Sequence, residues 1–437
     1  MKILLFVFLS SIFELANEAV VNMQVGWNLG NTLESNSGDT TNMWIEKWSQ
    51  RKTSDYETAW GQVVTTQALI HMCKEAGFNA IRVPVTWYPH TKTQWTFTPS
   101  SSTIWSPTLD PIGTTIDPVW MARVKQVVDY VIDEGMYCIL NIHHDTGTSN
   151  THWLIADTVN YNTQHERFAA IWQQIAEEFK DYDEHLLFEG YNEMTDKANS
   201  WCFASYGTPS HYNAGMAASA YEAINRYAQL FVTTVRATGG NNTYRNLIIN
   251  TYAGCDGHGT WNTHLNDPLK NMKLPKDEVE NHLIFEVHSY WDTKNFTNAS
   301  VAQLTTAMNN LNTYLATPNL TPVIIGEWGS SDDSGGSKPQ QLNAFAQAFS
   351  REAKKAGFTT FYWMGLTDGK DRGIPQWTQP DVKDAILRGY QEATPLNEVH
   401  DWAPDHRIFS VMGQYMGTDA TSLPAGLYIL NHRIVQK

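Results

Sequence analysis

LLFEGYNE, residues 186 to 193, is a short apolar run that ends in polar side chains. VIIGE, residues 323 to 327, repeats this pattern later in the chain, with an apolar run that ends in a glutamate. Runs of this kind alternate with longer segments in which apolar residues recur with a helical period. That alternation is typical of βα units around a parallel sheet, so the sequence predicts an α/β protein.

Eight runs are predicted as strands: Val25–Leu29, Ala80–Val85, Tyr137–Ile142, Leu186–Tyr191, Leu247–Asn250, Leu283–Val287, Val323–Gly326 and Thr360–Trp363. Seven segments are predicted as helices: Trp60–Ala76, Pro118–Glu134, Gln164–Lys180, Met216–Ala237, Ala299–Leu315, Gln340–Ala356 and Asp381–Glu392. The segment Trp261–Met272 has the weakest helical period of those between strands.

Eight alternations without a glycine-rich phosphate turn after the first strand favour a closed (β/α)8 TIM barrel over a doubly wound sheet. In such barrels the active site lies at the carboxyl ends of the strands. The sequence has no phosphate-binding motif between a strand and a helix, so it gives no support to a nucleotide cofactor.

The domain prediction has three parts: a signal peptide over residues 1–19, a barrel over 20–395 and a small C-terminal β tail over 396–437. Lys2 followed by the apolar run Ile3–Phe13 has the form of a secretion signal and is too short to span a bilayer. It predicts a secreted protein, and the alternative is a buried N-terminal helix. Two insertions, Pro89–Thr115 and Thr195–Tyr212, follow strand ends and should overhang the active face.

Composition restricts the partners. The 437 residues are 42% hydrophobic, and 30 Lys and Arg against 45 Asp and Glu give a net charge of −15, which argues against a nucleic-acid partner. The 17 Trp, 19 Tyr and 17 Phe, many beside loop residues, suggest a sugar ligand, although they could equally fill the core. The four cysteines have no zinc-ligand spacing: Cys73 and Cys138 fall in apolar segments, whereas Cys202 and Cys255 are candidates for a disulfide.

The candidate site consists of the polar and aromatic residues that follow the predicted strands: Asn28, Arg82, His143, His144, Asn192, Glu193, His288, Tyr290, Glu327 and Trp363. Two carboxylates at separate strand ends suit the hydrolysis of a glycosidic bond, which needs one acid and one carboxylate. Glu193 follows an apolar run that favours its protonated form. Arg82 and Tyr290 are the natural groups to keep Glu327 ionised.

Some of these residues have a second interpretation. Arg82 could instead brace the strands beneath the site. The run His143-His144-Asp145 raises the question of a metal, but strand alternation lets only one histidine face the centre, and we favour His143. Trp363 could be core, yet Trp27, Trp87, Trp153, Trp261 and Trp291 also lie near strand ends, which fits sugar stacking better.

Six segments together resemble the cellulase family, glycoside hydrolase family 5, in order from about Met23 to Ala393. They are Gly26–Glu34, Ile81–Trp87, Asn141–Asp145, Gly190–Met194, Val287–Tyr290 and Ile325–Gly329. The resemblance implies a retaining endo-β-1,4-glucanase, without a cofactor or catalytic metal, that acts on cellulose-like or mixed-linkage β-glucan. The alternatives are a related glycanase for xyloglucan or mannan and a non-catalytic sugar-binding barrel.

The same resemblance implies roles for the site residues. Glu193 would be the acid/base and Glu327 the nucleophile, with Tyr290 and Arg82 steadying it. Asn192 would bind the sugar 2-hydroxyl, and the central subsite would be formed by His143, His288 and Trp363, with Asn28 and His144 also in the substrate-binding set.

The tail resembles the C-terminal sorting module of the type IX secretion system, through Val411–Gln414 and Leu423–Ile429. That resemblance implies contact with secretion machinery and release outside the cell or attachment to its surface. The alternative is a small accessory β-domain.

Overall fold

The computed structural model describes residues 14–38, 44–45, 49–50, 52–91, 113–147, 151–196, 198, 212–259, 263–331 and 338–393, together with the backbone of four short strands after residue 407. The chain divides into two compact units, residues 1–390 and residues 391–437. The first unit carries the candidate site.

Eight parallel strands form a closed barrel in chain order, from β1 to β8, with β8 pairing back onto β1. Their bounds are β1 Val25–Asn28, β2 Ala80–Val83, β3 Tyr137–Asn141, β4 Leu186–Glu189, β5 Leu247–Cys255, β6 Leu283–Trp291, β7 Val323–Ser330 and β8 Thr359–Tyr362. The predicted (β/α)8 TIM barrel is confirmed, and each of the eight predicted runs coincides with a strand of the barrel for most of its length.

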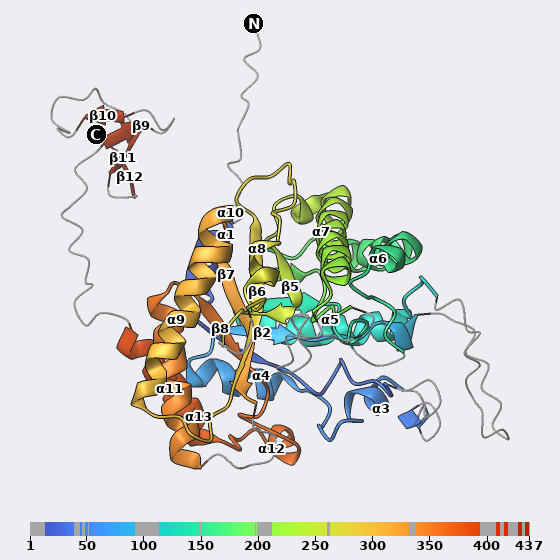
Figure 1. Ribbon diagram of the computed structural model, residues 1–437, viewed down its shortest axis with the longest axis horizontal. Helices are drawn as coiled ribbons and strands as arrows, with labels where there is room; N and C mark the ends of the chain where they lie inside the picture. Colours follow the sequence, from blue (N-terminus) through green and yellow to red (C-terminus); the bar gives the residue numbers. More distant parts are fainter. Residues whose placement is uncertain are drawn as a thin grey trace, which may run out of the picture. The chain divides into compact units, whose positions relative to one another are not determined.

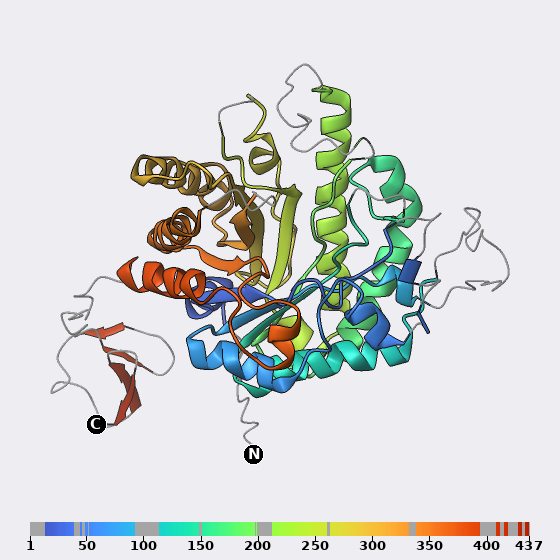
Figure 2. The same ribbon diagram turned by 90° about the horizontal axis from the view of Figure 1, so that it is seen from below.

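Helices surround the strands (Figures 1 and 2). The longer ones are α4 Gln67–Ala76, α5 Pro118–Asp133, α6 Thr158–Glu178, α7 Ala214–Ala237, α9 Val301–Leu311, α11 Pro339–Lys355 and α13 Pro380–Ala393. The shorter ones are α1 Ala16–Asn22, α3 Thr53–Glu57, α8 Asp267–Lys270, α10 Thr317–Asn319 and α12 Lys370–Gly373, with single turns at Tyr88–His90, Gly240–Thr243, Asn298–Ser300 and Asn312–Ala316.

Side-chain caps explain several helix starts. Asp157 accepts from the backbone N–H of Val159 and Asn160, so α6 begins six residues before the predicted Gln164. Asp117 and Asn213 cap α5 and α7 in the same way. The predicted helix from Trp60 is shorter than expected and starts at Gln67. In the weakly periodic segment Trp261–Met272, the one helix among the described residues is α8.

The interior of the barrel is built in layers, as side-chain alternation requires. The lower layer is apolar and packs against Ala16, Val20 and Met23 at the N-terminal end of the barrel; it contains Ala80, Ile139, Leu187, Ile248, Ile284, Ile324 and Phe361. The next layer toward the carboxyl ends of the strands is polar and fully buried: Asn28, Arg82, Asn141, Glu189, Asn250 and Glu286. This polar layer supports the candidate site.

The helix α1 lies at the floor of the barrel. The Ala16 N–H donates to the Asn281 carbonyl at 2.8 Å, and the Thr359 hydroxyl donates to the Val20 carbonyl. The predicted signal-peptide boundary at residue 19 therefore falls inside a packed helix, while residues 1–13 lie outside the described part. Among the described residues, no helix combines the length and apolar character needed to cross a bilayer.

The second unit contains β9 Ile408–Ser410, β10 Tyr415–Gly417, β11 Leu427–Leu430 and β12 Arg433–Gln436. They form an antiparallel sheet in the order β10-β9-β11-β12, which agrees with the predicted β tail. The unit begins at residue 391, five residues before the predicted boundary. The segments Val411–Gln414 and Leu423–Gly426, on which the sorting resemblance rests, lie outside the described residues.

Cys73 and Cys138 are free and buried, as their apolar surroundings predict. Cys255 is disulfide-bonded. Cys202, the partner that the sequence suggests, lies outside the described residues. So do most of the two predicted insertions, including Trp201, Phe203 and Tyr206.

Candidate active site

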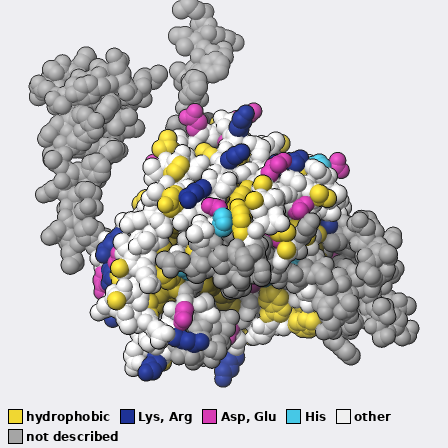
Figure 3. All heavy atoms as spheres, in the orientation of Figure 1, with side chains coloured by type: hydrophobic (Ala, Val, Ile, Leu, Met, Phe, Trp, Pro, Cys, Tyr) yellow, Lys and Arg dark blue, Asp and Glu magenta, His cyan; other side chains and the backbone are white. Residues whose placement is uncertain are grey.

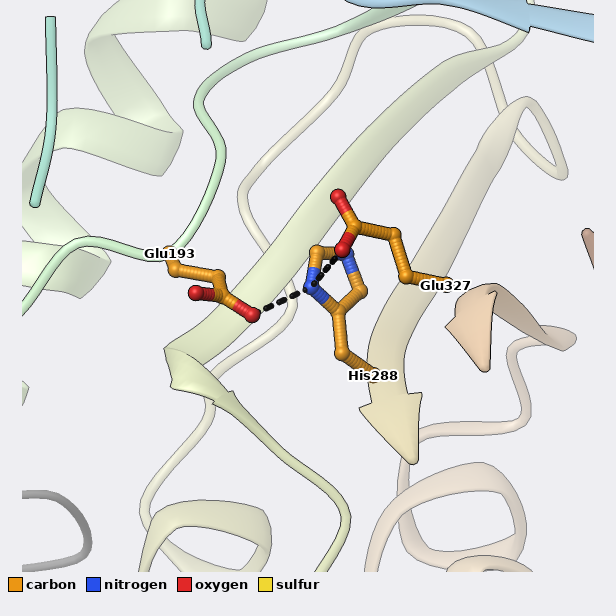
Figure 4. Close-up of side chains that lie close together, drawn as sticks. All are labelled: Glu193, His288 and Glu327. Atoms are coloured by element: carbon orange, nitrogen blue, oxygen red, sulfur yellow. Dashed lines mark hydrogen bonds and ion pairs between the residues drawn. The ribbon is translucent and has the colours of Figure 1, made fainter. Parts of the chain in front are cut away.

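Glu193 and Glu327 reach toward His288 from opposite sides (Figure 4). Glu193 lies in the loop after β4, whereas Glu327 and His288 belong to β7 and β6. One carboxylate oxygen of each glutamate and one ring nitrogen of His288 lie within 4.8 Å of one another. The side chain of Glu193 is 22% exposed and that of Glu327 is 6% exposed, so both carboxyl groups are largely shielded from solvent.

Arg82 connects the polar layer to the site. Its guanidinium donates to Glu327 Oε1 at 2.7 Å and to both oxygens of Glu189 at 2.6 and 2.7 Å. Its other acceptors are Asn28 Oδ1 at 3.0 Å and Asn192 Oδ1 at 2.9 Å. Arg82 therefore has both roles that the sequence allowed: it braces strands beneath the site and it holds Glu327.

Glu327 has a second donor on its other oxygen. The Tyr290 hydroxyl donates to Glu327 Oε2 at 2.7 Å. Burial, together with the charges of Glu327 and Glu193, raises the pKa of Tyr290 well above its usual value, so this hydroxyl keeps its proton. The two donors that were expected to stabilise ionised Glu327 are both in contact with it.

Glu193 lies in surroundings that favour its proton. Burial raises the pKa of Glu193, and the nearby charge of Glu327 acts in the same direction, whereas the hydrogen bond from His288 opposes it. The two glutamates therefore differ in their surroundings: Glu327 accepts hydrogen bonds from Arg82 and Tyr290, whereas burial favours the protonated form of Glu193.

His288 lies between the two glutamates. Its Nδ1 is 2.8 Å from Glu193 Oε1 and 3.6 Å from Glu327 Oε2. Although burial opposes it, the charge of Glu327 and the hydrogen bonds to Glu193 and Glu286 raise the pKa of His288 to about 10. The raised pKa favours the imidazolium form of His288.

His143 and His144 both border the site, which corrects the expectation from strand alternation. Strand β3 ends at Asn141, so the two histidines lie in the turn that follows it. His143 Nε2 is 3.8 Å from Glu327 Oε1, and its ring stacks on Trp363 with centroids 5.8 Å apart. His144 lines a cleft of about 370 Å³ beside Glu193, together with Trp44, Trp60 and His152.

Asp145 does not join the two histidines. Its oxygens accept from the backbone N–H of Trp87 at 2.7 Å and of Tyr88 at 2.9 Å, and from Trp153 Nε1 at 2.7 Å. Both oxygens hold loops in place, so the metal interpretation of His143-His144-Asp145 is wrong. The carboxylate that His143 faces is Glu327.

Among the described residues, one group has the spacing of metal ligands: Glu193, His288 and Glu327. Within it, His288 Nδ1 faces an oxygen of each glutamate, and a proton there serves both as a donor and as a positive charge. A proton on His288 Nδ1 would therefore supply positive charge at the point where these ligand atoms converge.

Chelation tests this interpretation. We expect dialysis against EDTA to leave the rate of polysaccharide hydrolysis unchanged, because the charge between the carboxylates is a proton on His288. The measurement is initial rate before and after dialysis, with and without added Ca²⁺ or Mg²⁺. Loss of rate that a divalent ion restores would contradict it, whereas a change in melting temperature alone would not.

The structure places the remaining candidates at different depths. Asn28 is fully buried and donates to the Gly326 carbonyl at 2.9 Å, so it supports Arg82 from within the polar layer. Asn192 is 3% exposed and lines the same cleft as His144. Trp363 is partly exposed beside His143.

The loop aromatics are mixed in role. Trp27 and Trp87 are fully buried and Trp153 is 6% exposed, so these three belong to the core, contrary to the stacking interpretation. Trp291 is partly exposed and stacks on His258 with centroids 4.2 Å apart. Trp261 lies outside the described residues.

Four residues of the polar layer were missed by sequence reasoning: Asn141, Glu189, Asn250 and Glu286. Each lies inside or at the end of a run that otherwise reads as apolar. Burial raises the pKa of Glu189 to about 7 although the charge of Arg82 opposes it. The sequence signal that could have found them is a charged or amide residue in an apolar run, at a position whose side chain points into the barrel.

On the face drawn in Figure 3, Lys and Arg side chains lie scattered among acidic ones, and no single basic patch gathers there. The face carries apolar side chains between them.

Comparison with known proteins supports the same interpretation as the geometry of the site. The family model described as "Cellulase (glycosyl hydrolase family 5)" matches residues 39–366. Endoglucanase B of Ruminococcus albus is 35% identical over 401 residues, which cover 87% of this chain and 82% of that protein.

Solved structures agree. A GH5-4 broad specificity endoglucanase from an uncultured bacterium is 44% identical, with a TM-score of 0.77 over 87% of this chain and 96% of that one. A family 5 enzyme of Prevotella bryantii B14, solved with a xyloglucan tetradecasaccharide, is 39% identical, with a TM-score of 0.72 over 87% of this chain and 99% of that one.

Proposed function

Since the chain belongs to glycoside hydrolase family 5, we propose that it hydrolyses internal β-1,4 bonds of a glucan with Glu193 as acid/base and Glu327 as nucleophile. The observation that carries these roles is the pair of carboxylates within 4.8 Å, one held by two donors and the other in surroundings that favour its proton. Its substrate is a polysaccharide, as in the endoglucanases that it resembles.

The first chemical step uses both glutamates. Glu193 Oε1 accepts from His288, so the transferable proton sits on Oε2 and passes to the glycosidic oxygen as the bond breaks. Glu327 attacks the anomeric carbon and forms a covalent glycosyl–enzyme. Arg82 and Tyr290 stabilise the Glu327 carboxylate before the ester forms and again when it is released.

In the second step Glu193, now ionised, removes a proton from water, which attacks the anomeric carbon and frees Glu327. The His288 imidazolium stabilises the Glu193 carboxylate during the interval between the two steps. The cycle ends with the starting protonation of both glutamates.

Stereochemistry tests the geometry. Two displacements at one carbon cancel, and carboxyl groups roughly 5–5.5 Å apart support them, whereas an inverting site needs roughly 6.5–9.5 Å for a water. We expect the first product to keep the β configuration. Proton NMR of early hydrolysis, recorded before mutarotation, measures it, and an initial α-anomer signal would contradict the nucleophile role of Glu327.

Two alternatives to an unbranched β-glucan remain as substrates, and a specific observation favours one of them. The Prevotella bryantii enzyme was solved with a xyloglucan oligosaccharide, so a branched glucan is the second candidate and mannan is the third. Comparison of kcat/KM on carboxymethylcellulose, mixed-linkage glucan, xyloglucan and mannan decides between them. Binding to all four without release of reducing ends would instead indicate a non-catalytic barrel.

We also propose that the protein acts outside the cell, with the N-terminal apolar run as the export signal and the C-terminal unit as a sorting module. The support is the form of residues 2–13 and the antiparallel sheet of the strands β9 to β12 in the C-terminal unit. Fractionation of cells that express the full chain, against one that ends at residue 393, tests whether the tail is needed for export.

A further inference from the structure

Glu286 lies in the polar layer directly below the two catalytic candidates. It is fully buried, two residues before His288 on β6. Its carboxyl group occupies the space beside Gly326 on β7, where a Cβ would collide with Glu286 Oε1. The residue before Glu327 must therefore be glycine for this carboxylate to fit.

The contacts of Glu286 point to His288. Glu286 Oε1 is 3.2 Å from His288 Nε2 and 3.4 Å from Arg82 Nε. Arg82 Nε already donates to Glu189 at 2.6 Å. His288 is therefore the main hydrogen-bond partner of Glu286. Oε2 of Glu286 has no hydrogen-bond partner among the described residues. A buried carboxylate that is only partly satisfied costs stability, so its presence here calls for an explanation.

Both ring nitrogens of His288 face carboxylate oxygens. Nδ1 faces Glu193 and Glu327, and Nε2 faces Glu286. A neutral imidazole has one N–H and could serve one of these two sides, whereas an imidazolium donates on both. Asn250, the polar neighbour from β5, has its amide Nδ2 placed 3.3 Å from Nε2, while its Oδ1 has no partner among the described residues. An imidazolium N–H at Nε2 requires the amide to be rotated so that Oδ1 faces it, and this rotation would also give Oδ1 a partner.

We propose that Glu286 is a positioning residue that keeps His288 doubly protonated, so that the Nδ1–H always points at Glu193. The inference rests on the proposed roles of Glu193 and Glu327. The new element is that the charge state of His288 is set by Glu286, a carboxylate in the polar layer beneath the site that does not contact the substrate.

The charged groups that face His288 are Glu193 from the loop after β4, Glu286 from β6 and Glu327 from β7, with Arg82 behind Glu286. Glu193 loses and regains its charge in each cycle, and the charge of Glu327 disappears while the ester exists. Glu286 is the one of the three carboxylates that takes no part in bond formation. It therefore holds the proton on His288 while the other two change.

Glu286→Gln tests the proposal in the full chain, because it keeps the shape of the side chain and removes the charge. The readout is the ¹⁵N NMR titration of the His288 ring in histidine-labelled protein without substrate, with a His288→Gln spectrum to assign its signals. We expect the titration midpoint of His288 to fall by about one to three pH units. We also expect kcat, measured at a pH between the original and the lowered midpoint, to fall about tenfold or more while KM changes by less than about twofold.

Glu189→Gln is the matched control. Glu189 lies in the same layer, and its carboxylate accepts hydrogen bonds from Arg82 through both oxygens and from Asn141. The His288 midpoint should move less in this variant than in Glu286→Gln. An equal or larger movement would mean that buried charge in general, not the contact with Nε2, sets the state of His288, and would overturn the proposal.

A second substitution relocates the charge. Asn250→Asp in the Glu286→Gln background places a carboxylate opposite the same Nε2, and it should raise the His288 midpoint again. If Glu286→Gln does not fold, Glu286→Asp replaces it, with a smaller fall of the same sign. An unchanged His288 titration in a folded Glu286 variant overturns the inference. Since no substrate is present, this result is independent of whether Glu193 and Glu327 have the proposed roles.

Discussion

Glu327→Gln should reduce kcat by about four orders of magnitude or more, because the amide cannot form the glycosyl–enzyme. The change keeps the size of the side chain and leaves an oxygen for the Arg82 or Tyr290 donors, so the cleft should retain its shape. Oligosaccharide affinity should stay within about tenfold of the original. The measurements are the rate of reducing-end release and the dissociation constant of a cello-oligosaccharide by calorimetry.

Glu177→Gln is the control for that experiment. Glu177 lies on the surface of α6, where its side chain is 46% exposed and pairs with Lys180. It should match the original rate, because exposed ion pairs of this kind contribute little. Turnover by Glu327→Gln close to that of the control would remove Glu327 from the mechanism.

Glu193→Ala should abolish hydrolysis of polysaccharide but spare the first step on a substrate with an activated aryl leaving group. Such a leaving group departs without a proton, so glycosylation of Glu327 proceeds and deglycosylation becomes rate-limiting. Azide needs no general base and fits the space that the side chain vacates. We expect azide to raise turnover of the aryl glycoside by about tenfold or more and to yield a β-glycosyl azide.

The configuration of the azide product identifies the role of Glu193. A glycosyl azide of β configuration, seen by NMR, requires attack on a covalent intermediate from the face that Glu193 borders. If azide leaves the rate unchanged while the aryl glycoside is still cleaved slowly, Glu193 is not the acid/base. The original enzyme serves as the control, since its intact base makes azide unnecessary.

The sequence predicted the barrel because buried parallel strands appear as short apolar runs and amphipathic helices as segments in which apolar residues recur with a helical period. Both patterns can be recognised in the sequence alone. It also predicted Arg82 and Tyr290 as partners of Glu327, since residues at the carboxyl ends of the strands must meet at one face. The strand-end rule also gave His144, Asn192 and Glu193 in the lining of the cleft, whereas Trp44, Trp60 and His152 were missed because they lie in segments away from the strand ends.

The polar layer could not be predicted in the same way. Glu286 sits inside LIFEVH, where a single charged residue in an apolar run says nothing about which strand it faces. Its nearness to His288 follows from their two-residue spacing on β6, but the space that its carboxyl group occupies depends on Gly326 in the next strand, which the residue's own segment does not contain. Strand alternation allowed one of His143 and His144 to face the centre, whereas both border the site because they lie in the turn after β3, where alternation no longer applies.

The pairing of β1 with β8 has a consequence for how the chain acquires activity. Asn28 donates to the Phe361 carbonyl across 333 residues, and Val25 pairs with Thr360. During synthesis, no closed barrel exists until the residues of β8 are available, and Arg82 cannot meet Glu327 until β7 has been made. Ribosome-bound chains shorter than about 360 residues are thus expected to be catalytically silent and protease-sensitive, and activity arises in one late, cooperative event rather than by gradual maturation.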